Sequence, residues 1–269
     1  MPVRVPTICR SLACEQVEAV LISHRYRFID TKTVKTAGTS VESYFERFCM
    51  PEGEWAYSHA REEYESPSGI IGYRGPEEPP KSKWYNHMPA ELIRQQIGTE
   101  IWNSYFKFCV IRDPFEKAIS AFEHLGRNHA IPRGPRGLWF RLRHRGYTAE
   151  QLRFLHWLTL GRRAIDRDKY LIGATFCLDD VVRYESLETD LARICDRLGV
   201  AWEPARLPRL KSEFRRQTST ISRLYTAPAL RLVAQAYDFE IARFGYEFPG
   251  GRRATMPDKT VVSDPPVLP

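Results

Sequence analysis

A short turn of small polar residues between a strand and a helix is the feature that most constrains this chain. Residues 26–31, YRFIDT, predict a strand, and residues 40–49, SVESYFERFC, predict a helix. Between them, residues 34–40 read VKTAGTS, in which one lysine precedes a run of Thr, Ala, Gly and Ser. A strand–loop–helix unit aims backbone N–H groups and the positive end of the helix dipole into the loop. The loop is therefore a candidate seat for phosphate or sulfate.

The same stretch also has an ordinary explanation. Ser and Thr commonly cap a helix, and Lys35 would then be a solvated surface lysine. The nucleotide-binding pattern GxxxxGK[ST] is absent, because here the lysine comes before the glycine. Taken alone, residues 34–40 leave both interpretations open.

A second strand end has a similar form. Residues 105–111, YFKFCVI, predict a buried central strand, and PFEKAISAFEHL predicts a helix that Asp113 caps, with proline at its first position. Arg112 follows the strand directly, and Ser120 lies two helical turns further on. Eight residues of helix span about 12 Å, so these two side chains reach one phosphate only if the helix starts after Arg112 and the loop folds back.

The remaining elements continue the alternation of strands and helices. We expect helices at 90–97 closed by Gly98, at 148–160 after a Thr148–Gln151 capping box, at 187–198 ended by Gly199 and at 226–245, and a strand at 180–185. This order predicts an α/β fold with a parallel sheet, whose ligands bind at the carboxyl ends of the strands.

The 269 residues suit one substantial domain. We place it at 26–248, preceded by an N-terminal extension at 1–25 and followed by a flexible tail at 249–269. Two long excursions interrupt the domain, at 51–86 and at 124–149. The second contains six arginines and no acidic residue, which is typical either of a solvated loop or of a mobile flap that attracts an acidic acceptor.

Charge and composition limit the classes of partner that the protein can bind. The net charge of +7 favours anionic partners, such as nucleotides, acidic glycans, nucleic acid or a membrane surface. We find no secretory signal and no apolar run near the roughly 18 residues that a membrane span needs. The six cysteines form no CxxC pair, so we expect neither a disulfide framework nor a metal site. These features predict a cytoplasmic protein.

Together, the two strand ends resemble the PAPS-dependent sulfotransferases of the carbohydrate-type family 2. In that family a PKT[AG]GTS loop holds the 5′-phosphosulfate of 3′-phosphoadenosine 5′-phosphosulfate (PAPS), and an RxPxxRxxS segment holds the 3′-phosphate. The matching stretches here are VKTAGTS and RDPFEKAIS, and the resemblance covers most of residues 26–248. It implies a P-loop-like three-layer α/β fold with a central parallel sheet flanked by helices.

Two positions depart from the family pattern. Val34 replaces a proline, which loosens the backbone of the loop but removes no ligand. Lys117 replaces the second arginine, which keeps the charge but loses the bidentate fork.

The resemblance also implies roles for single residues. Those that would hold PAPS are Lys35, Thr36, Ala37, Gly38, Thr39, Ser40, Arg112, Ser120, Lys211 and Ser212. Lys35 would also stabilise the leaving oxygen of the product, adenosine 3′,5′-bisphosphate. His87, in the NHMPA stretch between the two motifs, would be the catalytic base, with His59 and His124 as weaker candidates. The implied acceptor is a hydroxyl group, and an acidic carbohydrate would suit the positive charge; neither its identity nor the oligomeric state is indicated.

Two other functions fit parts of the sequence. A nucleoside-triphosphate-dependent kinase would also bind phosphate at a strand–loop–helix unit, but we find no convincing strand that ends in a magnesium-binding aspartate. A non-enzymatic glycan- or nucleic-acid-binding module explains the charge and the arginines, but leaves Lys35 and Arg112 as coincidences. We do not expect nucleic acid as a partner.

Overall fold

A six-stranded mixed sheet lies at the centre of the computed structural model, which describes residues 20–58, 60–75, 82–85, 87–126, 128–208, 221 and 223–248. The strands, in sheet order, are β3 (Tyr64–Ser66), β4 (Gly69–Ile71), β1 (Leu21–Ser23), β2 (Phe28–Asp30), β5 (Phe106–Ile111) and β8 (Asp180–Arg183). A separate hairpin joins β6 (Leu171–Ile172) to β7 (Thr175–Phe176). The α-helices are α1 (Gly38–Phe45), α2 (Ala90–Ile97), α3 (Thr99–Ser104), α4 (Pro114–Leu125), α5 (Pro135–Arg143), α6 (Ala149–Thr159), α7 (Arg167–Tyr170), α8 (Leu187–Leu198), α10 (Ala227–Ala236) and α11 (Asp238–Phe244). Short 3-10 turns lie at Glu46–Cys49, Tyr184–Ser186 and Pro204–Arg206.

The predicted parallel sheet is right for one half of the observed sheet and wrong for the other. β5 pairs in parallel with β2 and with β8. β1 instead runs antiparallel to β2 and β4, and β3 closes that edge antiparallel to β4. β1 lies within the predicted extension at 1–25, and β3 and β4 lie within the predicted excursion at 51–86. Strands of three residues are too short for alternation to reveal them.

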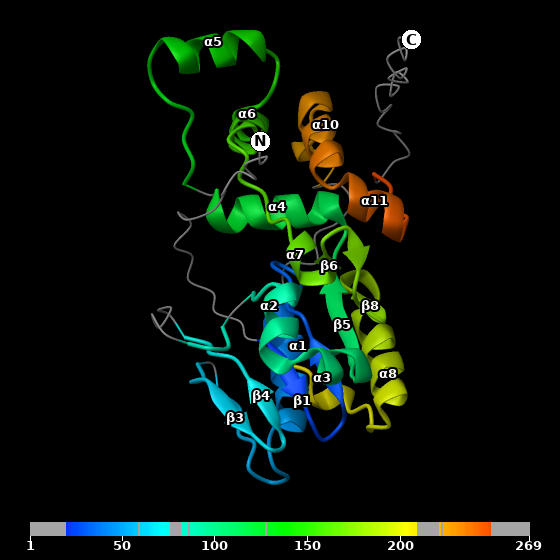
Figure 1. Cartoon of the computed structure of the whole chain (residues 1–269). Helices are drawn as coiled ribbons and strands as arrows, with labels where there is room; N and C mark the ends of the chain where they lie inside the picture. Colours follow the sequence, from blue (N-terminus) through cyan, green and yellow to red (C-terminus); the bar gives the residue numbers. More distant parts are fainter. Residues whose placement is uncertain are drawn as a thin grey trace, which may run out of the picture.

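Successive side chains of the sheet point into two different cores, as strand geometry requires. Phe108 and Val110 of β5 pack in a core with α1 and α8, whereas Cys109 and Ile111 face a second core. Ile29 of β2 packs with α2 and α3 on that opposite side. Helices therefore flank both faces of the sheet, which gives the expected three layers; Figure 1 shows α1 and α8 beside the strands.

A third group of helices forms its own core beyond the sheet. Phe122 of α4, Phe154 and Trp157 of α6, and Val233 of α10 pack together there. Figure 1 shows these helices above the strands, with α5 standing at the top of the view. The predicted excursion at 124–149 thus contains a helix, α5, which lies on this helical part of the molecule.

The predicted helix caps are confirmed, but the predicted last helix at 226–245 is wrong. Asp113 accepts hydrogen bonds from two N–H groups of α4, and the capping box at Thr148 of α6 is present. The last helix breaks at Tyr237 into α10 and α11. Arg167 donates to the carbonyl of Ala236 at 2.9 Å, and the Tyr237 hydroxyl donates to the carbonyl of Ala164 at 3.0 Å. Side-chain contacts to the rest of the fold thus hold the bend.

Buried ion pairs join α1 to segments next to the strands. Glu42 and Glu46, one turn apart on α1 and its 3-10 extension, are fully buried. The Glu42 carboxylate contacts the ammonium of Lys32 and, at 2.8 Å, the guanidinium of Arg74, and both cations are themselves buried. Glu46 pairs with Arg74 at 3.3 Å and also with Arg61. Because both carboxylates, Lys32 and Arg74 are buried and only Arg61 is partly exposed, each buried charge depends on its partners.

We expect Glu42→Gln to lower the free energy of unfolding by about 3–5 kcal/mol, because it leaves the Lys32 and Arg74 charges buried with one carboxylate fewer. Urea unfolding followed by circular dichroism measures this loss. Glu150→Gln is the matched control, since Glu150 pairs with Arg223 at the surface, where the two side chains are 45% and 68% exposed. It should cost at most about 1 kcal/mol, and equal losses in the two variants would contradict the assignment.

Candidate functional site

The two strand ends that the sequence singled out lie in contact. Since β2 and β5 are parallel neighbours, their carboxyl ends share one edge of the sheet. The hydroxyl of Thr33, after β2, donates to the carbonyl of Val110 in β5. The Arg112 guanidinium donates to the carbonyl of Lys35 at 3.4 Å. The lysine-led loop and the arginine segment therefore meet, although 77 residues separate these two side chains in the sequence.

The loop backbone has the alternating form of an anion-binding concavity. Lys35 has φ of 63° and Ala37 has φ of 59°, both in the left-handed region, whereas Thr36 between them is not there. Successive N–H groups in such an alternation turn toward one point, as in phosphate-binding loops. α1 begins at the next residue, Gly38, so its N-terminus opens into the same concavity. Positive φ at non-glycine residues costs about 1–3 kcal/mol each and is concentrated at functional sites.

Two polar groups of the loop form hydrogen bonds within the loop. The family resemblance assigned Thr36, Thr39 and Ser40 to PAPS, but the Thr36 side chain is buried and its Oγ1 lies 2.8 Å from Oγ1 of Thr33. The Ser40 N–H donates to the Ala37 carbonyl at 2.9 Å. The Thr36 hydroxyl thus stabilises the loop, and the N–H of Ser40 closes the first turn of the helix.

Asp166 is a residue that sequence reasoning missed. It is almost fully buried, and its carboxylate accepts a hydrogen bond from the Val34 N–H at 3.1 Å. The same carboxylate contacts the ammonium of Lys117 on α4. Lys117, which stands where the family has a second arginine, therefore has its charge paired within the protein. Asp166 ties the loop after β2 to the helix after β5, and no local pattern marks it.

Arg112 is held by three neighbours and has a buried donor without a partner in the described part of the chain. Its guanidinium lies 4.2 Å from the ring centroid of Tyr184 and donates to Glu116 at 3.2 Å. Its Nε is buried and has no hydrogen-bond partner among the described residues. A buried N–H without an acceptor is costly, which favours an anion there. Ser120 is half-buried on α4, one turn beyond Lys117, and does not line the cavity beside Arg112.

His87 lies against the loop after β2. Its Nδ1 is 3.3 Å from the carbonyl oxygen of Lys32. Because a carbonyl only accepts, this contact places the hydrogen of the neutral ring on Nδ1 and the lone pair on Nε2. His87 also has a positive φ, of 51°, which makes it the third residue of the candidate site with a left-handed backbone.

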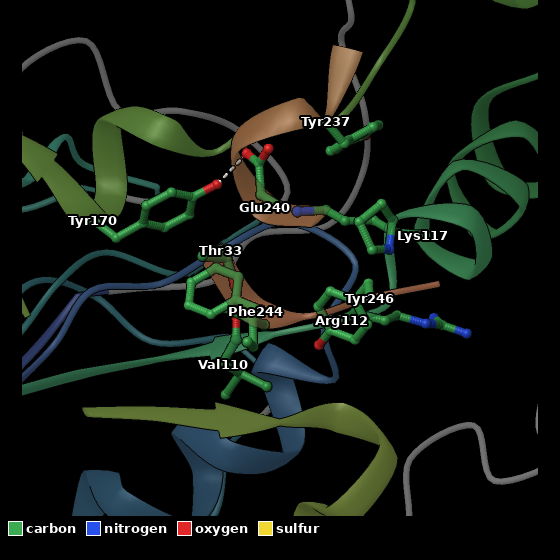
Figure 2. A pocket seen from close by; sticks show the side chains of 11 residues that line it. Thr33, Val110, Arg112, Lys117, Tyr170, Tyr237, Glu240, Phe244 and Tyr246 are labelled. Atoms are coloured by element: carbon green, nitrogen blue, oxygen red, sulfur yellow. Dashed lines mark hydrogen bonds between the residues drawn. The ribbon is translucent and has the colours of Figure 1, made fainter. Parts of the chain in front are cut away.

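A narrow cavity lies between Arg112, Thr33 and the C-terminal helices (Figure 2). It has about 10 Å³ of space, enough for about one water molecule. On its far wall the Tyr170 hydroxyl donates to Glu240 at 2.5 Å, and burial raises the pKa of Tyr170. A nucleotide needs several hundred Å³, so it could bind only outside this cavity.

A wider hollow, of about 370 Å³, lies at the other end of α1. It is lined by Tyr44, Arg47 and Trp55 among others, and Arg47 pairs with Glu203 at 3.0 Å. It shares α1 with the strand-end site but none of the predicted site residues.

Three of the residues singled out from the sequence, Lys211, Ser212 and the weaker candidate base His59, lie outside the described residues. The other predicted site residues are described. None of the helices in the described ranges is long and apolar enough to cross a membrane.

Comparison with known proteins gives one match. A family model described as "Sulfotransferase family" matches residues 18–247. No curated protein and no solved structure matches the chain. The matched range starts before β1 and ends after α11, so it includes every strand of the sheet and both strand ends of the candidate site.

We expect Asp113→Asn to stabilise the protein more as the pH rises. Burial, opposed by the two α4 N–H groups and aided by Glu116 and Glu185, raises the pKa of Asp113 to about 6. The ionised carboxylate therefore disfavours the folded state increasingly as the pH rises from about 4 to about 6, while asparagine still caps the helix. Thermal melts of both proteins from about pH 4 to pH 8 should show an advantage of the variant that grows to about 1–3 kcal/mol. An advantage independent of pH would contradict this.

Proposed function

The chain belongs to the sulfotransferase family, and on that basis we propose that it transfers a sulfuryl group from PAPS to a hydroxyl group of a carbohydrate. The donor and the acceptor class are those that the family resemblance implies. The net charge of +7 suits both a bisphosphorylated nucleotide and an acidic sugar.

The observation on which the proposal rests is the contact between two candidate anion-binding sites. One is the left-handed turn at Lys35 and Ala37 at the start of α1. The other is Arg112, whose guanidinium touches the Lys35 carbonyl and keeps a buried Nε without a partner in the described part of the chain. A nucleotide with phosphate groups at both its 5′ and 3′ positions has the charge pattern that two adjacent seats require.

PAPS, when bound, would supply an activated sulfuryl group joined to a good leaving group. The backbone N–H groups around Ala37 and Gly38 would hold its 5′-phosphate. The Lys35 ammonium would offset the negative charge that develops on the bridging oxygen, in the way that preorganised cations assist phosphoryl transfer. Arg112 would hold the 3′-phosphate with charge-assisted hydrogen bonds, and Tyr184 beneath it keeps the guanidinium plane in place.

His87 is the proposed base. As the acceptor oxygen forms its bond to sulfur and the sulfur–oxygen bond to the nucleotide breaks, the hydroxyl proton must leave. Nε2 of His87 would take it, because the contact of Nδ1 with the Lys32 carbonyl puts the lone pair on Nε2. The Lys32 carbonyl then stabilises the imidazolium that forms.

Adenosine 3′,5′-bisphosphate should raise the melting temperature, whereas AMP and ATP should not, with or without magnesium. At a ligand concentration of about 100 times Kd, the expected gain is about 2.7 kcal/mol, or about 5–10 °C. Arg112→Ala should remove most of the shift by the bisphosphate, and Lys35→Ala should reduce it and nearly abolish transfer of labelled sulfate to carbohydrate acceptors.

The matched control for these substitutions is Arg193→Ala, on α8, whose side chain is 46% exposed. It removes one positive charge away from the strand ends and should leave the shift unchanged. A shift by ATP and magnesium alone would favour a kinase, and full transfer activity in both Lys35→Ala and Arg112→Ala would rule out the proposed site.

For His87 we expect a loss of catalysis without a loss of nucleotide binding. His87→Asn suits the test better than alanine, because asparagine tolerates the left-handed backbone at this position. Transfer should fall by about 100-fold to 10,000-fold, the usual contribution of a general base, while the thermal shift by the bisphosphate stays the same. A parallel loss of both readouts would show that His87 shapes the nucleotide site instead.

A further inference from the structure

Helix α5 presents an apolar face to solvent. Leu138, Trp139 and Leu142 are 58%, 60% and 59% exposed, the highest values among the large hydrophobic residues that the structure describes. Figure 1 shows the helix at the top of the molecule, joined to α4 and α6 by two connections. Large apolar side chains grouped in this way mark an interaction surface.

Residues of α5 outside this apolar face contact the segment before the helix and also α6. A Cβ on Gly137 would lie 1.8 Å from the carbonyl oxygen of Pro132, so only glycine allows this approach. The Phe140 ring lies edge-on to His156 of α6, with ring centroids 5.0 Å apart. Arg141 donates to the Pro132 carbonyl at 3.4 Å. These contacts fix the rotation of the helix, and with it the direction of the apolar face.

Arginines border that face on both sides. At 100° per residue, the three apolar side chains fall within an arc of about 100°. Arg141 lies next to one edge of the arc, and Arg143 and Arg136 lie beyond the other. The Arg143 guanidinium is 5.2 Å from the ring centroid of Trp139. An apolar stripe with aromatic and leucine side chains between cations is the pattern of helices that lie in the plane of a membrane interface.

The charge around α5 is unbalanced. Five exposed arginines surround the helix, and none of them forms an ion pair in the described part of the chain: Arg133, Arg136, Arg141, Arg143 and Arg145. From residue 124 to residue 149 the sequence contains no acidic residue. The complementary partner is therefore anionic.

The apolar side chains decide which anionic partner fits. An acidic polysaccharide would pair with the arginines but would give Leu138 and Leu142 nothing apolar to bury against. At a bilayer surface, leucine and tryptophan enter the boundary between headgroups and acyl chains, while arginines bind lipid phosphates. We propose that α5 docks this protein on the surface of an anionic phospholipid bilayer, with Leu138, Trp139 and Leu142 inserted. The inference does not depend on the proposed sulfuryl transfer.

Vesicle flotation with the full chain tests the proposal. The chain should bind vesicles of about seven parts phosphatidylcholine to three parts phosphatidylglycerol in about 0.1 M salt, and bind phosphatidylcholine vesicles weakly. The triple variant Leu138→Ser, Trp139→Ser, Leu142→Ser should lower the partition coefficient about tenfold or more. Trp139→Phe should keep binding but lose most of the blue shift of tryptophan emission on mixing with vesicles.

The matched control removes three other exposed apolar side chains. Leu92→Ser, Leu160→Ser and Ile165→Ser act on residues that are 36%, 50% and 42% exposed, and together they should leave vesicle binding unchanged. Melting temperatures of both triple variants close to that of the original chain show that neither is unfolded. The proposal is overturned if anionic vesicles do not bind the chain, or if the α5 triple variant binds them as well as the original. Binding only to a soluble acidic polysaccharide, lost on substitution of the arginines, would identify a glycan surface and also overturn it.

Discussion

The parallel pairing of β2 with β5 is the constraint on which the candidate site depends. The ladder aligns Asp30 with Phe108, and it continues past the strand where the Thr31 N–H donates to the Phe108 carbonyl at 3.0 Å. Thr33 then reaches the Val110 carbonyl. Because the two strands run in the same direction, the chain leaves both of them at the same edge. The contact between Lys35 and Arg112 follows from that register, and a slip of one residue would turn the Thr33 hydroxyl away from β5.

The start of α1 differs from the starts of the neighbouring helices in a way that suits a ligand. Asp113, Thr148 and Thr226 cap α4, α6 and α10 with their side chains. The N-cap of α1 is Ala37, whose methyl side chain cannot accept a hydrogen bond, and the first turn of α1 contains no acidic residue. An uncapped N-terminus is less stable by about 0.5–2 kcal/mol. The buried pairs of Glu42 with Lys32 and Arg74 stabilise the helix about one turn beyond this uncapped end.

Structural features that depend on residues close together in the sequence could be predicted, whereas features that depend on residues far apart in the sequence could not. Helix ends at Gly98, Gly199 and Thr226 were predicted because each depends on the conformation or the hydroxyl of a single residue. The two strand ends were found for the same reason, since strand, turn and helix are consecutive. Asp166 was not found, because its partners are 132 and 49 residues away. The break at Tyr237 was also missed, since contacts from outside the helix hold it in place.

Backbone strain distinguishes the candidate site from the rest of the described chain. Among all the residues that the structure describes, four non-glycine residues have positive φ. Three of them, Lys35, Ala37 and His87, belong to the candidate site, and the fourth, Arg27, lies in the turn between β1 and β2. Glycine at position 37 would relieve the strain and would remove no functional side chain. It would also let the unbound loop adopt other conformations, whose entropy would be lost when a ligand bound. Alanine restricts the loop before binding, so the strain at Ala37 is best explained as preorganisation of the N–H groups for an anion.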